Sequence, residues 1–196
     1  MSARSARQAT TGLPLPTEVD RLVRVPFDFE DYLALPEWHR AEYVDGMAIV
    51  SPSPVAAHQR ISHRVVDVIQ AGCPGLFVLA AVGVWTGERR SRIPDAYATE
   101  RSFEGSWSDQ TPVLVVEILS PSTRREDTLR KSTEYADAGI GQYWIVDRDH
   151  RTLTVLGNTG HGWDTLLDLD DSTPRGSVAV GDHGVVAIDL ATLLAT

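Results

Sequence analysis

The sequence has a single lysine, a single cysteine and no long apolar run. Its 18 basic residues are all arginines except Lys131. One cysteine, Cys73, excludes an internal disulfide and a paired-cysteine zinc site, and it favours a reducing cytoplasm. The longest apolar run, residues 76–82, is far too short to span a bilayer. We therefore expect a cytoplasmic protein that makes no membrane contact.

Several catalytic motifs are also absent. There is no Gly-x-Ser-x-Gly nucleophile elbow, no His-Glu-x-x-His zinc motif and no phosphate-binding Gly-Lys-Ser/Thr loop. The net charge of -9 opposes broad attraction to the phosphates of nucleic acids. Residues 161–196 hold six acids and one base, whereas residues 84–131 hold eight of each. A surface that binds nucleic acid would therefore be confined to the neutral middle of the chain.

The composition is that of an ordinary globular protein. Hydrophobic residues make up 42% of the 196 residues and charged residues 23%, which excludes disordered, collagen-like and coiled-coil proteins. The first residues are polar and lack an apolar core. We expect a disordered or loosely attached tail over residues 1–24 and a single domain over residues 25–196.

The first half of the chain predicts short elements and one long helix. Asp28 can cap a helix through Leu33, and a second helical piece is expected at residues 38–42. Asp-Gly within residues 43–50 predicts a tight hairpin. Apolar residues between 61 and 72 recur with helical spacing.

The second half alternates apolar runs with one amphipathic segment. Residues 113–119 form the clearest buried strand. A helix closed by Gly139 is expected at residues 126–138. Other strands are expected at residues 76–85, 94–98, 142–147 and 152–156, and a strand followed by a short helix at 185–194. This order predicts an α/β protein (α+β mixed sheet), with a central mixed sheet flanked by helices.

Glu117 is the one charged residue in the buried strand. Burying a carboxylate in such a strand costs on the order of several kcal/mol of folding free energy, unless a cation contacts it or the end of the strand is open to water. An arginine partner is one explanation for Glu117, and a functional site is the other.

Asp95 begins another strand and strengthens the functional interpretation. Neighbouring strands can bring Asp95 and Glu117 to one point, and two converging carboxylates suit Mg²⁺ or Mn²⁺ better than zinc. Taken alone, Asp95 would be a turn residue after Pro94.

Lys131 lies on the helix expected after Glu117. Asp127 and Glu134 are spaced to form an exposed ion pair with it, worth about 0.3 to 0.5 kcal/mol. Arginine would serve such a pair equally well. A compact ammonium beside a metal-bound water is a role that arginine cannot copy, so the single lysine favours function.

Further candidates surround these residues. His58 at the start of the long helix can contact a phosphate or be an ordinary first-turn residue, and Tyr135 can share the site or belong to the core. Two arginine clusters, which include Arg92 and Arg124, bracket the proposed ligands in sequence. They are either a phosphate-binding rim or a solvated face.

Several sequence blocks together resemble a known family. The blocks are Glu42–Gly46, Ser51–Pro54 with His58-Gln59, Pro94-Asp95, Val116–Thr123, Lys131 with Tyr135, and Tyr143–Asp147. Their types and order, over residues 27–194, resemble the Uma-type restriction endonucleases of the PD-(D/E)XK nuclease superfamily.

The resemblance implies a restriction-endonuclease-like fold. It implies a Mg²⁺ (or Mn²⁺) site built from Asp95 and Glu117, with Glu42 as an additional acid. The superfamily's usual lysine follows the second acid by two residues, where this chain has Leu119. In this arrangement Lys131 reaches the site from the helix instead.

Three functions are consistent with these residues. The first is a Mg²⁺-dependent endonuclease acting on DNA, in which Lys131 orients the attacking water and a homodimer would match two-strand cutting. The second is a nuclease-fold protein that is weakly active or inactive and binds nucleic acid or a protein partner; Leu119 and the acidic total favour it. The third is a metal-dependent hydrolase that acts on a smaller phosphate or on another substrate.

Overall fold

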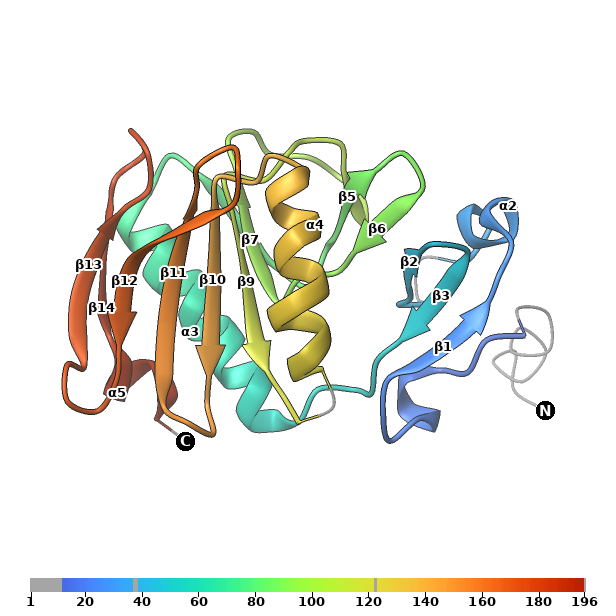
Figure 1. Ribbon diagram of the computed structural model, residues 1–196, viewed down its shortest axis with the longest axis horizontal. Helices are drawn as coiled ribbons and strands as arrows, with labels where there is room; N and C mark the ends of the chain where they lie inside the picture. Colours follow the sequence, from blue (N-terminus) through green and yellow to red (C-terminus); the bar gives the residue numbers. More distant parts are fainter. Residues whose placement is uncertain (1–11, 37–38, 122, 196) are drawn as a thin grey trace.

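The computed structural model describes residues 12–36, 39–121 and 123–195. Short elements and one long helix make up the first part of the chain, as the sequence predicts (Figure 1). They are η1 (Pro16–Glu18), β1 (Val23–Pro26), α2 (Phe29–Leu33), β2 (Glu42–Val44), β3 (Met47–Val50), α3 (Ala56–Gly72), β4 (Phe77–Ala80) and β5 (Gly83–Gly87).

Strands dominate the second part. The elements are β6 (Arg90–Arg92), β7 (Ala96–Thr99), β8 (Trp107–Ser108), β9 (Leu114–Leu119), η2 (Glu126–Lys131), α4 (Ser132–Asp137), β10 (Gln142–Asp147), β11 (Thr152–Asn158), β12 (Trp163–Leu169), β13 (Arg175–Ala179), β14 (Val185–Asp189) and α5 (Leu190–Leu194).

Two six-stranded sheets carry the structure. The larger runs β12-β11-β10-β9-β7-β4, in which only β9 and β10 are parallel. The second runs β1-β3-β2-β6-β5-β8, and β13 and β14 form a separate ribbon. The predicted mixed sheet with flanking helices is confirmed, although the strands divide between two sheets rather than one.

Strand β9 lies in the middle of the larger sheet and is buried along its whole length. Leu114, Val116 and Ile118 pack on one face with the apolar side of α3. Because side chains alternate across a strand, Val115 and Glu117 face the other side, where Val115 packs with Tyr135 of α4. Figure 1 shows α3 and α4 on opposite faces of this sheet, so the β9 carboxylate is directed toward the α4 side.

The hairpin and helix-cap predictions are confirmed. Asp45 and Gly46 both have positive φ, at 52° and 78°, in the turn between β2 and β3. Asp28 caps α2, because its carboxylate accepts a hydrogen bond from the Glu30 backbone N–H at 2.8 Å. These turns fix where β2 presents Glu42.

Three predicted elements are corrected. The apolar run 76–85 is not one strand: Ala81, with φ of 57°, separates β4 and β5, which belong to different sheets. The helical piece expected at 38–42 is wrong, because Glu42 is in β2 and residues 39–41 are not helical, while residues 37–38 lie outside the described residues. The helix at 126–138 begins as a π-helix in η2.

Part of the expected N-terminal tail is packed. Residues 1–11 lie outside the described residues. Leu13 is only 6% exposed and belongs to an apolar cluster with Tyr32 and Tyr43, and β1 begins at Val23. Leu13 therefore contributes to the core, with the partly buried Val19 packed against the same cluster, although both precede residue 25.

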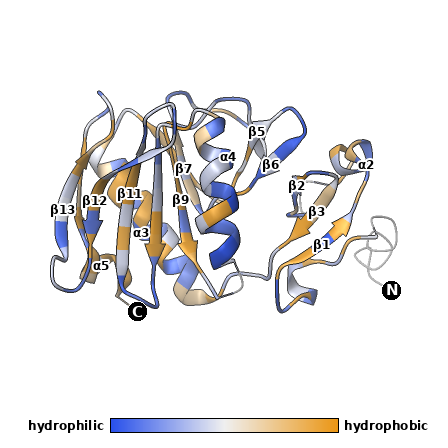
Figure 2. Ribbon diagram, viewed as in Figure 1, coloured by the Kyte–Doolittle hydropathy of each residue, from blue (hydrophilic) through white to orange (hydrophobic). Residues whose placement is uncertain are grey.

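The strands of the larger sheet are more apolar than the start of the helical segment that packs on the Glu117 face of that sheet. Figure 2 shows apolar colour along much of the central strands and a hydrophilic stretch at the beginning of the helical segment that contains η2 and α4. That polar stretch lies against the sheet face that carries Glu117. Among the described helices, none combines the length and apolarity that a membrane crossing needs.

Candidate active site

Glu117 is buried and meets a cation, as the sequence predicts. The residue is 2% exposed. Its Oε1 accepts hydrogen bonds from Lys131 Nζ at 2.9 Å and from the Tyr135 hydroxyl at 2.6 Å. Burial raises the pKa of Glu117 well above its usual range, and the neighbouring carboxylates of Asp127 and Asp95 raise it further, against the lowering effect of Lys131.

Lys131 lies among three carboxylates. Its Nζ is 2.9 Å from Glu117 Oε1, 3.2 Å from Glu42 Oε1 and 3.2 Å from Asp127 Oδ1. The expected pairing with Asp127 is thus present, but it is buried instead of exposed, since the two side chains are 7% and 2% exposed. Burial alone would lower the pKa of Lys131, yet the three carboxylates outweigh it and raise that pKa well above its usual value.

The π-helical turn explains how these groups meet. A π-helix is wider than an α-helix and closes hydrogen bonds between residues i and i+5. In η2 this winding buries Glu126, Asp127 and Lys131, while Leu129 is 60% exposed. The Tyr143 hydroxyl donates to the Asp127 backbone carbonyl at 2.8 Å, which fixes the turn to β10. Wide helical turns of this kind are frequent at functional sites.

Arg92 is the second buried cation. Its guanidinium binds Glu42 at 2.8 Å, Glu126 at 2.9 Å, and Glu134 at 2.6 and 2.9 Å. The side chain is 0% exposed, so Arg92 is not placed to touch a substrate, which corrects its expected position on a phosphate-binding rim. It instead joins β2, η2 and α4 through their carboxylates.

Glu42 links the two cations. Its Oε2 accepts from Arg92, its Oε1 lies beside Lys131, and Oε1 also accepts from the Ile93 backbone N–H at 3.0 Å. Burial would raise the pKa of this carboxyl, but Lys131 and Arg92 lower it to about 2. Glu42 is therefore a fixed anion next to the site lysine.

The buried cluster contains more acids than bases. Its buried charged residues are Glu42, Arg92, Glu117, Glu126, Asp127, Lys131 and Glu134. Arg24 adds a partly exposed cation against Glu126. The remaining excess of negative charge favours binding of a further cation.

Asp95 immediately precedes β7 and lies next to Glu117 of the neighbouring strand β9. Strand pairing sets Ala96 opposite Val116, so one step further along the ladder Asp95 stands opposite Glu117. Asp95 Oδ2 accepts from the Ile118 backbone N–H at 2.7 Å. Its side chain is 24% exposed, which makes it more accessible to solvent than Glu117.

His58 joins Asp95 from the first turns of α3. Its Nε2 is 3.2 Å from Asp95 Oδ2 and 3.2 Å from the Ile118 carbonyl oxygen. Burial alone would lower the pKa of His58, but the hydrogen bond and charge of Asp95 outweigh it and raise that pKa. The structure thus places His58 with the predicted metal ligand Asp95.

The His58 pair predicts a pH dependence of stability. The pKa of His58 is higher in the folded state, so its contribution to the free energy of unfolding is complete below the unfolded histidine pKa. That contribution disappears as pH rises through the folded pKa. The free energy of unfolding of wild type, measured by chemical denaturation, should therefore fall as pH rises above the unfolded histidine pKa of about 6.5, and it should fall less for His58→Gln.

The matched control is His63→Gln, which replaces an exposed histidine on the same helix. It should keep the wild-type pH dependence. Equal slopes for wild type and His58→Gln would contradict the ion pair.

Arg124 is bound to the end of β10. Its guanidinium makes two hydrogen bonds to the Asp147 carboxylate, one of them at 3.0 Å. The Asp147 carboxylate also accepts from the backbone N–H groups of Asp149 and His150, both at 3.0 Å. Arg124 is nevertheless 34% exposed, so it fixes the segment before η2 and still borders solvent.

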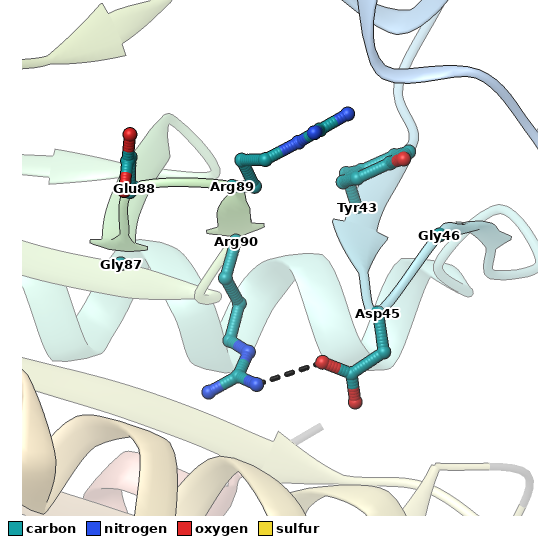
Figure 3. A pocket seen from close by; sticks show the side chains of 7 residues that line it. All are labelled: Tyr43, Asp45, Gly46, Gly87, Glu88, Arg89 and Arg90. Carbon is teal, nitrogen blue, oxygen red and sulfur yellow. Dashed lines mark hydrogen bonds and ion pairs between the residues drawn. The ribbon is translucent and has the colours of Figure 1, made fainter.

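A pocket of about 550 Å³ adjoins the buried cluster (Figure 3). It lies between the β2–β3 and β5–β6 turns, and Arg90 crosses it to bind Asp45 at 2.8 Å. Arg90 Nε is also 3.9 Å from Glu134 Oε1, which connects the pocket to the Arg92 network. The lining residues are Tyr43, Asp45, Gly46, Gly87, Glu88, Arg89 and Arg90.

The donor set fits a hard divalent cation. The candidate ligands are carboxylate oxygens of Glu42, Asp95, Glu117 and Asp127, without a thiolate, and Mg²⁺ and Mn²⁺ prefer such oxygens. Within residues 12–36, 39–121 and 123–195, no three His, Cys, Asp or Glu side chains already enclose a metal position. Lys131 lies between the carboxylates that would have to converge.

The sequence interpretation missed functional neighbours on the helix. The spacing of Asp127 and Glu134 from Lys131 predicts only exposed ion pairs, and no local pattern singles out Glu126. All three are buried in the cluster. Asp127 at i−4 and Glu134 at i+3 share the Lys131 face of a helix with Tyr135 at i+4, whereas Glu126 at i−5 gives no such signal.

This fold and site define a class of protein. A mixed sheet with helices on both faces, an acidic strand residue beside a second carboxylate, and a lysine on Glu117 are the features of a restriction-endonuclease-like nuclease. The family model described as "Putative restriction endonuclease", Uma2, matches residues 29–194. The chain therefore belongs to the Uma2 family.

Two similar proteins agree with this assignment. The structure of "a putative nuclease belonging to DUF820" from Anabaena variabilis superposes with a TM-score of 0.69 and 23% identity, covering 86% of this chain and 99% of that one, and it shows the fold. A "Structure-specific endonuclease subunit SLX1" from Mycosarcoma maydis is 25% identical over 170 residues, which is 85% of this chain. The chain spans 23% of the length of that relative.

Proposed function

We propose that this protein is a Mg²⁺-dependent endonuclease that hydrolyses phosphodiester bonds in DNA, with Mn²⁺ as an effective substitute. The observation that carries the proposal is the 2.9 Å contact between Lys131 Nζ and Glu117 Oε1 in the buried cluster. Every other basic residue in the chain is an arginine, and the one lysine lies on the acidic residue of the central strand. Membership of a restriction-endonuclease family supports the same activity.

Each site residue has a distinct role in this proposal. Asp95 and Glu117 hold the divalent cation, which when bound supplies a water of lowered pKa and polarises the phosphate. Lys131 orients the attacking water and stabilises negative charge on the phosphate. Before a cation binds, Glu42 contacts the ammonium of Lys131, and the Tyr135 hydroxyl donates a hydrogen bond to the carboxylate of Glu117.

The nucleic acid contacts are proposed at exposed basic side chains near the cluster. Arg89 lies over the Phe29 ring at 4.6 Å from its centroid and lines the pocket in Figure 3. Arg90 shares that pocket, and Arg124 borders solvent on the other side of η2. Local arginines of this kind can bind phosphates although the whole chain is acidic. The endonuclease name of the SLX1 relative supports a nucleic acid substrate.

The test is cleavage of supercoiled DNA by the purified protein with Mg²⁺ or Mn²⁺. We expect nicked and linear products, which a chelator should prevent. Asp95→Asn should reduce the rate by about 100-fold or more, because it removes the charge of one metal ligand without changing the side-chain volume. Asp109→Asn, in a separate surface segment, is the control and should cleave normally. Cleavage that persists with Asp95→Asn and with chelator would contradict the proposal.

A second function is binding without cutting. Leu119 stands where the superfamily usually has its lysine, and the ammonium of Lys131 is held by three carboxylates. Both observations favour a nuclease-fold protein that binds nucleic acid or a protein partner. Salt-sensitive DNA binding that chelators leave unchanged, in protein that cuts no DNA, would favour this function.

Assembly and location are also part of the proposal. Cutting both strands of a duplex is achieved most simply by a homodimer with two-fold symmetry, which sedimentation analysis with DNA would test. The free, buried Cys73 suits the reducing cytoplasm.

A further inference from the structure

We propose that Lys131 is the resident cation of the metal site, so that a divalent cation binding at Glu117 must displace the ammonium. The inference rests on the proposed function, because it concerns the same carboxylates. It assigns Glu42 and Asp127 to the cation position together with Glu117. In this view Lys131 belongs to the site and also competes with the metal for the carboxylates.

The first argument is the geometry around Nζ. Carboxylate oxygens from β2, β9 and η2 converge on this one atom at 2.9 to 3.2 Å. The side chains of Glu42, Glu117 and Asp127 are 9%, 3% and 2% exposed, so water competes little with the ammonium for their oxygens. Oxygens from three separate elements thus already surround one cation, the ammonium, although among the described residues no three acidic side chains are arranged to hold a metal as they stand.

The second argument is the spacing of the carboxylates. Oxygen ligands lie about 2.1 Å from Mg²⁺, whereas the ammonium holds these oxygens near 3 Å. A divalent cation in this position would therefore draw the carboxylates inward after the lysine leaves. The ammonium and the metal cannot occupy the position together.

The third argument is the way Asp127 is paired. Asp127 Oδ1 is buried and makes no hydrogen bond within the described parts of the chain. It faces Nζ at 3.2 Å in the ion pair. The ammonium therefore meets this buried oxygen as an ion pair without a well-directed hydrogen bond, and coordination of a metal would replace that contact.

The fourth argument is which cation can move. The guanidinium of Arg92 is held by four hydrogen bonds to three carboxylates and is 0% exposed. Lys131 is a point charge on a flexible stem, and its side chain is 7% exposed. Displacement of Lys131 would leave Arg92 in place and free the ammonium to face the phosphate.

The experiment compares Mn²⁺ binding to wild type, Lys131→Met and Arg130→Met by titration calorimetry. Lys131→Met should bind Mn²⁺ more tightly by about tenfold or more, because a competing charge at contact distance is removed. Arg130→Met removes the same charge from the neighbouring residue, whose guanidinium lies 3.6 Å from Asp45 and is 48% exposed. It should leave the affinity near that of wild type.

A second measurement uses wild type and the fact that the chain has one lysine. Protein labelled with ¹³C-lysine gives a single side-chain signal, from Lys131. Titration with diamagnetic Mg²⁺ should shift this signal in step with the calorimetric binding curve. The measurement does not depend on whether Lys131→Met folds.

Three results would overturn the inference. One is folded Lys131→Met that binds Mn²⁺ no more tightly than wild type. Another is a lysine signal that stays fixed while Mg²⁺ saturates the protein. The third is the absence of cation binding to wild type and variant alike. Wild type that binds Mg²⁺ with a shifted lysine signal but cuts no DNA would overturn the proposed nuclease function alone.

Discussion

Glu117→Gln is expected to reduce metal-dependent DNA cleavage by about 10³-fold or more. The amide keeps the volume of the side chain but removes the negative charge that would bind the cation. Glu117 is also the residue that contacts both Lys131 and Tyr135, so the substitution weakens the position of the lysine. The loss should lie in kcat and in Mg²⁺ affinity, with DNA affinity at low salt changed little.

The matched control is Glu134→Gln. It removes another buried carboxylate, which is 7% exposed and is bound by Arg92 instead of Lys131. Cleavage should fall by about tenfold at most, because this residue is outside the contacts of Lys131. Plasmid cleavage rates over a range of Mg²⁺ concentrations measure both effects. Equal losses in the two variants would show that the activity depends on the buried network in general and not on Glu117 as a ligand.

Glu117 shows what the sequence could predict. A single carboxylate in an apolar strand has to meet a cation or water, and the spacing of the following helix made Lys131 available to it. The structure confirms the buried strand and the lysine contact. Local patterns were sufficient here, because strand alternation and helix position together decide which residues face each other.

Arg92 and Asp127 show what the sequence could not predict. Arg92 lies near Arg89 and Arg90 in sequence, and charge clusters usually face solvent. Pairing of β6 with β2 and β5 turns this arginine inward onto three carboxylates. The i−4 spacing offers Asp127 to Lys131 as an exposed partner, with Glu134 as the alternative, but its burial depends on packing of η2 against the sheet. Tertiary pairing, which no local pattern contains, decides both cases.

Two backbone features, the π-helical turn of η2 and the break at Ala81, also have no signal in the local sequence. An α-helix and a π-helix bury similar amphipathic patterns, so residues 126–131 predict only a helix. The apolar run 76–85 gives no sign of the positive φ at Ala81 that sends β4 and β5 into different sheets. Strands β12 and β13 fall in a stretch rich in Asp, Gly and Thr, where turn residues obscure the alternation.

Arg92→Met is expected to destabilise the fold by about 3 to 5 kcal/mol at neutral pH. Methionine fills much of the space but leaves Glu42, Glu126 and Glu134 without their shared buried cation. Arg24 still contacts Glu126, and Lys131 still contacts Glu42. Among the described residues, Glu134 keeps the distant cationic contact with Arg90, at 3.9 Å, so the largest penalty falls on α4. Urea denaturation of both proteins measures the difference.

Arg90→Met is the matched control on the same strand. Arg90 is 34% exposed and binds the exposed Asp45, so its loss should cost at most about 1 kcal/mol. A loss for Arg92→Met no larger than this would contradict a supporting role for the buried network.

The effect of Arg92→Met should also depend on pH. In wild type Lys131 and Arg92 outweigh burial and hold the pKa of Glu42 at about 2, below its unfolded value, so that pairing stabilises the fold above about pH 4.5 and is lost as pH falls through the folded pKa. Without Arg92 the buried carboxylates can take up protons at higher pH, and protonation removes the cost of an unpaired charge. The difference between wild type and variant should therefore be largest near pH 7 and shrink toward pH 4. A difference that stays constant over this range would mean that the lost stability comes from packing of the arginine side chain and not from its charge.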